Sequence, residues 1–306
     1  IDRPIADCKE RRSTPNAAMN ISTSARDETF FAKNIPLLIA LAYFTISVLL
    51  VRNHEMWRDE MQAWLIVRDS ATFTDLLRNL KYEGHPPLWH ICLMLLGMVS
   101  ASPAAMQLLH VAIATATVFV FVKYSPFTNL QKLLFAFGYY SFFEYSIISR
   151  NYGIGILLIF IFCALYRFRS TQLIKIGFAL LLLSHANVFG LIIVIVVASA
   201  LIVDFYQARK HRPCKTHDVL RPATGFFLIV AGIATSVFQL VPPQDSGYAP
   251  GWLFRFDFMN LAKTIGALRN AYLPVQNQTL HFWNSNMFNE HHLQYASAAL
   301  VLLTMA

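Results

Sequence analysis

Long runs of apolar residues recur along this chain and constrain its fold more than any other feature. They predict helices at residues 35–51, 103–122, 133–149, 153–166, 173–187, 188–206, 223–241 and from 293 onward. Charged residues make up only 14% of the sequence, against about a quarter in soluble domains. A helix crosses a bilayer with ~20 largely apolar residues. The pattern therefore predicts an all-α, multi-pass transmembrane helix bundle.

The path of residues 87–100 decides the predicted topology, because this apolar segment has only 14 residues and opens with a proline pair. If it lies along the interface without crossing, basic residues concentrate in the connections on the side of the N-terminus. These are Lys123, Lys132, Arg167, Arg169, Lys175, Arg209, Lys210, Arg212, Lys215 and Arg221. Cytoplasmic loops are enriched in Lys and Arg. We therefore predict a cytoplasmic N-terminus.

The same topology gathers several polar residues at the opposite, extracytoplasmic face. They are Asp59, Glu60, His85, Arg150 and His185. Residues 242–292 are expected to form a second long loop on that side. We predict a multi-pass integral membrane protein, in the inner (plasma) membrane if the host is bacterial, with its active site facing outside.

Domain organisation is expected to be simple. Residues 1–34 read as a disordered cytoplasmic segment, and residues 35–306 as one transmembrane domain whose last apolar run ends abruptly at Ala306. We therefore expect the domain to be truncated at its C-terminus. The net charge of +8 resides largely in short connections and gives no sign of nucleic-acid binding. The four cysteines form no regular framework, so neither disulfides nor a zinc site is indicated.

The first extracytoplasmic loop carries two amphipathic patterns. Apolar residues recur at helical spacing in two sets: Trp57, Met61, Trp64 and Leu65, then Phe73, Leu76, Leu77 and Leu80. Such stripes are typical of helices that lie in the membrane interface. Gly84 is expected to end the second helix, before the His85-Pro86-Pro87-Leu88 element.

Asp59 and Glu60 are the first candidate functional residues. A carboxylate at a membrane face is costly to place and is often functional. The plainer interpretation is that these acids complement the helix dipole and pair with Arg58. Glu144, inside an apolar run, either serves the site or simply neutralises Arg150.

Arg150 is the candidate anion-binding residue, since a guanidinium holds phosphate through two parallel hydrogen bonds. A phosphate beside a carboxylate predicts a phosphate leaving group and an acid that acts as base. His90 follows His85 by five positions, but further metal ligands cannot be identified. No cofactor is therefore predicted, and a divalent metal is possible but not indicated.

The order of these motifs resembles a known enzyme family. The sequence has Asp59-Glu60, then HPPL, then Glu144 followed by Ser149-Arg150, and its closest part is WRDEMQAWLIVRDS…YEGHPPLW. This order is similar to that of the protein O-mannosyltransferases and the wider family 39 of GT-C membrane glycosyltransferases. The similarity in layout covers roughly residues 35–206. The spacing from Glu144 to Arg150 is shorter than expected for the mannosyltransferases.

The resemblance implies an inverting transfer of a sugar from a polyprenyl-phosphate carrier to an acceptor hydroxyl on a glycan, lipid or protein. Asp59 matches the family's catalytic acid and Glu60 is its neighbour, so both are expected to be catalytic. Arg150 matches the arginine associated with the carrier phosphate. His85, Tyr152 and Glu144 are expected to contribute to binding of the substrate or the carrier phosphate.

A transporter or lipid-carrier flippase is the alternative from another class. In that case Glu144 and Arg150 would form a gating pair, and no bond would be made. Transporters commonly contain internal repeats and helices broken near the bilayer midplane. The sequence contains no repeat, and an acidic pair in a loop with interfacial helices is not a transporter requirement.

Overall fold

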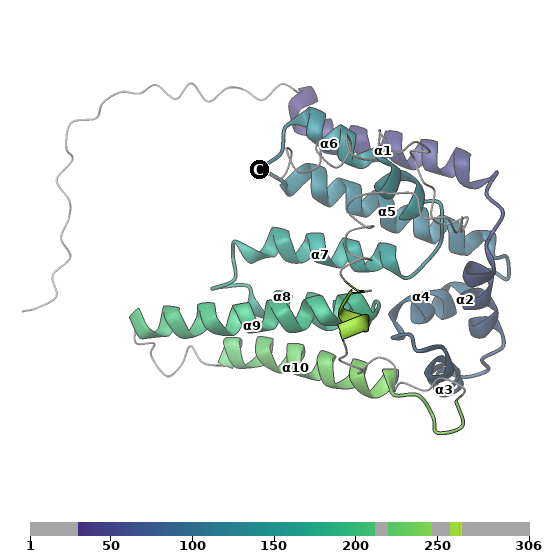
Figure 1. Cartoon of the computed structure of the whole chain (residues 1–306). Helices are drawn as coiled ribbons and strands as arrows, with labels where there is room; N and C mark the ends of the chain where they lie inside the picture. The colour runs from purple at the N-terminus through teal and green to yellow at the C-terminus, as the bar shows by residue number, and fades with distance from the viewer. Residues whose placement is uncertain (1–29, 212–219, 247–257, 263, 265–306) are drawn as a thin grey trace, which may run out of the picture. The chain divides into compact units, whose positions relative to one another are not determined.

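The computed structural model describes residues 30–211, 220–246, 258–262 and 264 (Figure 1). Contacts divide the chain into two compact units, residues 1–242 and 243–306, and the elements discussed below all belong to the first. All regular elements in the described residues are helical. The predicted helix from residue 293, most of the predicted loop 242–292 and the segment 1–29 lie outside the described residues.

The order of elements along the first unit follows most of the predicted apolar runs. The helices are α1 (Phe30–Val51), α2 (Arg58–Arg68), α3 (Phe73–Glu83), α4 (Leu88–Gly97), α5 (Ala104–Tyr124), α6 (Asn129–Ala136), the π-helix η1 (Tyr140–Glu144), α7 (Tyr152–Tyr166), α8 (Leu173–Ser184), α9 (Val188–His211) and α10 (Leu220–Leu240).

Four of these helices are long and apolar enough to cross a membrane: Asn34–Val51, Ala104–Tyr124, Val188–Gln207 and Pro222–Leu240. Large apolar side chains project outward from them, for example Leu49, Val196 and Phe238. No more than half of each segment is buried inside the protein. Lipid can cover such surfaces at no cost, whereas water would disfavour them.

The packing of α1 against α5 fixes where the first loop lies. Tyr43 of α1 clusters with Val118 of α5, whereas Val51, eight residues on, clusters with Val111. The two helices are therefore antiparallel, and residues 52–103 leave and re-enter at the same end of the bundle. Helix α4 has 10 residues, fewer than the ~20 that a membrane span needs. That residues 87–100 lie along the membrane interface stays a prediction.

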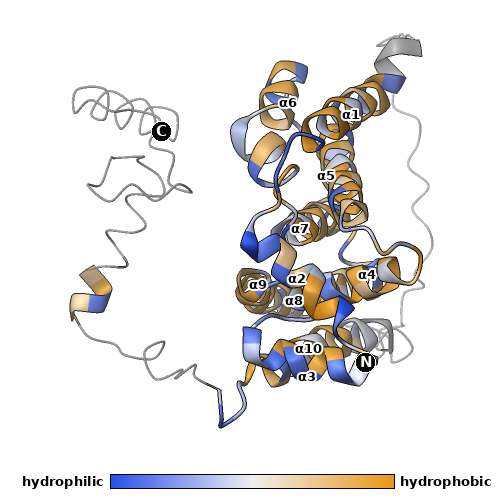
Figure 2. Cartoon of the chain, turned by 90° about the vertical axis from the view of Figure 1, so that its right-hand side faces the viewer, coloured by the Kyte–Doolittle hydropathy of each residue, from blue (hydrophilic) through white to orange (hydrophobic). Residues whose placement is uncertain are grey.

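We call this end of the bundle the α2 end, formed by residues 52–103, 146–152, 184–188 and 236–240. Helices α2, α3 and α4 lie here (Figures 1 and 2). Helix α3 starts at its cap residue Thr72, whose hydroxyl accepts the N–H of Asp75, and ends at Gly84 with a φ of 65°. Gln239 Nε2 donates to the Leu77 carbonyl at 2.8 Å, which joins α10 to α3. The two segments with amphipathic patterns form the helices α2 and α3, and their placement in the membrane interface stays a prediction.

The predicted helix at 133–149 is wrong as a single element. The chain turns through α6, breaks around Gly138, forms the π-turn of η1 and continues without helix to Asn151. The Tyr43 ring packs against Phe137 and Phe142, and its hydroxyl donates to the Ser141 carbonyl. The Tyr145 N–H bonds to the Tyr140 carbonyl five residues back, which defines a π-turn. Tyr43 occupies the Ser141 carbonyl, which a regular helix would use for its own backbone hydrogen bond. Helix α1 therefore stabilises the break through Tyr43.

Helix α7 starts at the α2 end and runs parallel to α5. Gly153 lies beside His110, and Phe160, further along, contacts Phe121. Helices α8 and α10 approach closely, because a side-chain carbon on Gly177 would lie 2.4 Å from the Gly225 carbonyl. Small residues permit such packing between apolar helices. The main apolar cluster, which includes Ile176, Leu180 and Ile229, forms around this contact.

Candidate functional site

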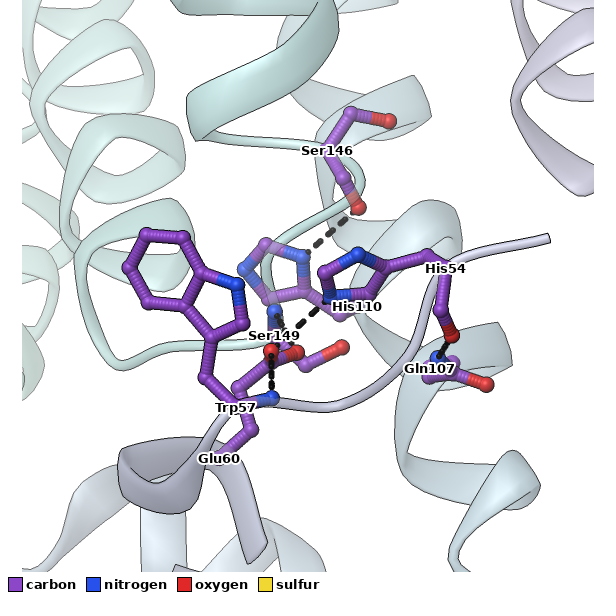
Figure 3. Close-up of polar contacts among 7 residues, drawn as sticks. All are labelled: His54, Trp57, Glu60, Gln107, His110, Ser146 and Ser149. Carbon is purple, nitrogen blue, oxygen red and sulfur yellow. Dashed lines mark hydrogen bonds and ion pairs between the residues drawn. The ribbon is translucent and has the colours of Figure 1, made fainter. Parts of the chain in front are cut away.

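The first turn of α2 carries both candidate acids, and Glu60 is the buried one. Its side chain has no solvent exposure. Its Oε2 atom accepts the Trp57 N–H at 2.8 Å and lies 2.9 Å from His54 Nε2. Its Oε1 atom accepts the Ser149 N–H at 2.7 Å (Figure 3). Glu60 therefore caps its own helix and joins it to the segment that leads to Arg150.

His110 of α5 holds the same segment from a second side. Its Nδ1 atom lies 3.0 Å from the Ser146 carbonyl, and its Nε2 atom lies 3.0 Å from the Arg150 carbonyl (Figure 3). The ring is buried. Gly153 leaves room for it, since a side-chain carbon there would lie 2.7 Å from His110 Nε2. The backbone on either side of Ser149 is thus fixed by contacts with α2 and α5.

Asp59, one position before Glu60, points to a different environment. Its Oδ2 atom lies 3.2 Å from Arg150 Nη2, and the two side chains are 51% and 30% exposed. The Arg150 guanidinium also lies over the Tyr152 ring, 5.2 Å from the ring centroid. Three of the predicted site residues, Asp59, Arg150 and Tyr152, therefore come together at the α2 end. An exposed pair of this kind is open to a ligand.

His85 lies near this pair. Burial lowers the pKa of His85 below its usual 6.5, and the nearby charges of Glu83, Arg150 and Asp59 modify this shift. The imidazole is therefore neutral at physiological pH, with one nitrogen able to donate a hydrogen bond and the other able to accept one. Burial also lowers the pKa of His90 to about 3, helped by His85, whose ring stacks on it at 6.4 Å.

Some predicted partners are not brought together. Glu144 accepts the Tyr139 hydroxyl at 2.9 Å and makes no ion pair with Arg150, so the proposed neutralisation of Arg150 falls to Asp59 instead. The plainer expectation that Asp59 and Glu60 pair with Arg58 also differs from the structure, since they pair with Arg150 and His54.

His185 reaches the α2 end, as predicted, but in a structural setting. Its carbonyl accepts the Leu88 N–H, and its ring bonds to the Leu181 carbonyl and the Thr235 hydroxyl. In the described part of the chain, no three His, Cys, Asp or Glu side chains come close enough to hold a metal ion.

Sequence reasoning missed His54 and His110. His54 lies just beyond the end of α1, six residues before Glu60, where nothing in the sequence marks it as a partner. His110 did carry a signal, because a histidine within an otherwise apolar run is costly in a membrane unless it is bonded. The third contact of Glu60, to the backbone of Ser149, has no signature in the side-chain sequence.

The geometry combines an accessible carboxylate and guanidinium with a buried network that fixes the backbone behind them. Such an arrangement can take a proton from a ligand hydroxyl and hold an anion alongside. Comparison with protein-family models, with curated proteins and with solved structures finds no match to this chain. A functional proposal therefore rests on these residues themselves.

Proposed function

We propose that this protein is an inverting membrane glycosyltransferase. It would move a sugar from a polyprenyl-phosphate carrier to an acceptor hydroxyl at the extracytoplasmic face. The observation that carries the proposal is the half-exposed Asp59 carboxylate beside the Arg150 guanidinium, 3.2 Å apart at the α2 end. A base and an anion-binding group at the same end of the bundle are the two groups that transfer from a lipid phosphate requires.

In the proposed reaction Asp59 accepts the proton of the acceptor hydroxyl as its oxygen attacks the anomeric carbon. The new bond joins this oxygen to the sugar, and the bond between the sugar and the phosphate oxygen breaks. The polyprenyl phosphate leaves with the electron pair. Arg150 stabilises the negative charge that develops on the phosphate. Attack from the face opposite the leaving group inverts the configuration.

The ion pair itself fits the state that precedes donor binding. A guanidinium engaged by Asp59 can exchange that carboxylate for a phosphate, since both anions match its planar set of donors. The exchange releases Asp59 to act as base. Binding of the lipid donor before the acceptor is therefore the expected order.

Supporting roles follow from the contacts around the pair. The neutral ring of His85 can donate one hydrogen bond to the phosphate without adding charge. The Tyr152 ring, under the guanidinium, limits its orientations. The buried Glu60 has its carboxylate oxygens engaged, so its proposed role is to position the Arg150 segment. Glu144 is assigned no role in the transfer.

The proposed orientation in the membrane is based on the basic residues at the end of the bundle opposite the α2 end. Lys123, Arg167 and Arg169 lie there, at the C-terminal ends of α5 and α7. With basic residues on the cytoplasmic side, a cysteine at exposed Asn53 should react with an impermeant thiol reagent applied to intact cells. A cysteine at exposed Gln207 should not react. The reverse labelling would place the candidate site in the cytoplasm.

One observation favours the alternative of a transporter or flippase: the return segment 125–151 is broken rather than a straight helix. Broken helices are frequent in transporters. In this chain, however, the break is packed by Tyr43, and the ion pair lies at the bundle end instead of the middle. Lipid-carrier translocation without release of polyprenyl phosphate, measured in proteoliposomes, would favour the alternative.

The deciding experiment is a transfer assay with the full-length protein in membranes. Polyprenyl-phosphate sugars with radiolabelled sugar groups would be supplied together with extracts that contain glycan, lipid or protein acceptors. We expect labelled acceptor to form with wild type and not with Asp59→Asn at equal protein levels. Equal amounts of labelled acceptor from wild type and Asp59→Asn would contradict the proposal.

A further inference from the structure

A groove between α2 and α3 is not used by the transfer chemistry described above. It has a volume of about 560 Å³, within the range of ~300–1,000 Å³ that small-molecule sites occupy. Polar side chains from both helices line it: Arg58, Gln62 and Asp69 from α2, and Asn79, Tyr82 and Glu83 from α3.

The periodicity of α2 places this groove next to Asp59. Glu60, Trp64 and Val67 are buried on the face that packs onto the bundle. Arg58 and Gln62 lie on the opposite face and line the groove. Because successive helix residues are rotated by ~100°, Asp59 projects between the two faces, one turn before Gln62. Arg58, the neighbour of Asp59, lines the groove, so the groove begins at the same turn of α2 that carries the Asp59 carboxylate.

The lining combines side chains that suit a sugar. The carboxylates of Asp69 and Glu83 accept hydrogen bonds, and the amides of Gln62 and Asn79 both donate and accept. Neighbouring sugar hydroxyls also donate and accept, so they match this set. The exposed ring of Tyr82 can cover the apolar C–H face of a sugar ring. Met61, Leu65 and Ile66 supply an apolar surface within the same groove.

The same lining disfavours other ligands. Asp69 is paired with Arg68 at 2.8 Å, and Arg58 balances Glu83, so the groove has little net charge to attract an anionic lipid headgroup or a nucleotide.

A contact between the helices connects the groove with the candidate active site. Gln62 Nε2 donates to Glu83 Oε2 at 2.6 Å. The negative charge of Glu83 raises the pKa of His85, and burial of the His85 ring lowers it. The groove and the candidate active site thus share residues at the C-terminal end of α3.

We infer that the groove between α2 and α3 is the acceptor subsite and that it takes a saccharide with neighbouring free hydroxyl groups. This inference rests on the proposed glycosyl transfer and narrows its acceptor to a glycan. One hydroxyl of the bound saccharide lies at the Asp59 end of the groove and loses its proton to Asp59. The remaining hydroxyls bind the amides and carboxylates along the groove.

Saturation-transfer NMR on the full chain in lipid nanodiscs tests binding independently of turnover. The probes are methyl glucoside, methyl mannoside, methyl galactoside and, separately, a serine-containing hexapeptide. We expect at least one glycoside to bind. Tyr82→Ala and the groove-filling Leu65→Trp should each weaken that binding on the order of tenfold, about 1.4 kcal/mol. Arg78→Ala, on exposed α3 surface outside the groove, is the matched control and should bind like wild type.

Two results would overturn the inference: binding of the peptide but of no glycoside, or absence of any binding. Equal loss of binding in Arg78→Ala and Tyr82→Ala would overturn it as well. Leu65→Trp guards against a folding defect in Tyr82→Ala, because the two act on different helices. Asp59→Asn should keep glycoside binding. If Asp59→Asn also keeps its transfer activity, the proposed function is wrong, but saccharide binding in the groove is still supported.

Discussion

The two acids that open α2 are adjacent in sequence but lie in opposite environments. Glu60 is sealed in the bundle and bonds to Trp57, His54 and Ser149. Asp59 is half exposed and makes one ion pair, with Arg150. A buried carboxylate with satisfied oxygens stabilises a structure but cannot exchange its partners without cost, whereas an exposed one can. The comparison supports a structural role for Glu60 and is consistent with the catalytic role proposed for Asp59.

Glu60→Gln should produce the largest loss of stability. The amide nitrogen would face a backbone N–H that the carboxylate now accepts, and His54 would lose its charged partner. Leaving a buried hydrogen-bonding group without a partner costs about 1–3 kcal/mol. We expect a clearly lower Tm in nanodiscs and loss of the inserted protein on mild heating. A Tm within one degree of wild type would contradict the structural role of Glu60.

Asp59→Asn should have the next largest effect, but on turnover. The variant keeps the shape of the side chain and cannot take a proton, so transfer should fall on the order of 10²-fold or more. The Tm should change little, because the exposed pair with Arg150 contributes ~1 kcal/mol or less. The measurement is initial transfer rate at matched amounts of inserted protein. A large loss of Tm with a normal rate would reverse the comparison between the two acids.

Arg150→Lys should have a smaller effect on activity and should mainly weaken binding of the polyprenyl-phosphate sugar. Lysine keeps the charge and loses the planar set of donors. We expect the KM for the polyprenyl-phosphate sugar to rise about tenfold, about 1.4 kcal/mol of lost interaction. Arg78→Lys, on the exposed surface of α3, serves as the matched control. Unchanged KM in Arg150→Lys would remove the guanidinium from the phosphate site.

His90 provides the smallest test, because it is buried like Glu60 but lacks a counter-ion. Its pKa is about 3 in the folded protein and 6.5 in the unfolded chain. As pH falls below 6.5 the unfolded chain binds the proton first, so the stability contribution present above pH 6.5 is lost progressively toward pH 3. Between pH 6.5 and 5.5 the loss is about 1 kcal/mol. Thermal melts of His90→Phe should show a weaker decline with pH than wild type over this interval.

Most of the fold could be predicted from the sequence, since apolar period and length determine where helices form. The apolar segment 87–100 forms the short helix α4, and the two apolar stripes of the first loop fall on the helices α2 and α3. The break in 133–149 could not be predicted, because it depends on Tyr43, nearly a hundred residues away. A tertiary contact there overrides a local apolar pattern.

The candidate site divides in the same way. Asp59, Arg150, Tyr152 and His85 were singled out from their residue types and positions, and the structure brings them to one end of the bundle. Their supports were not foreseen, because they use backbone groups: Glu60 binds the N–H of Ser149, and His110 binds the carbonyl of Arg150. Side-chain patterns carry little information about such contacts.

The close approach of Gly153 to His110 has a consequence for sequence variation. The imidazole occupies the space that any side chain at position 153 would need. The two positions are therefore expected to vary together: a relative with alanine or serine at 153 should carry a smaller residue at 110 and hold the Arg150 carbonyl in another way. Single exchanges at either position should be selected against, and the double exchange tolerated. Covariation between 110 and 153 would thus record this contact.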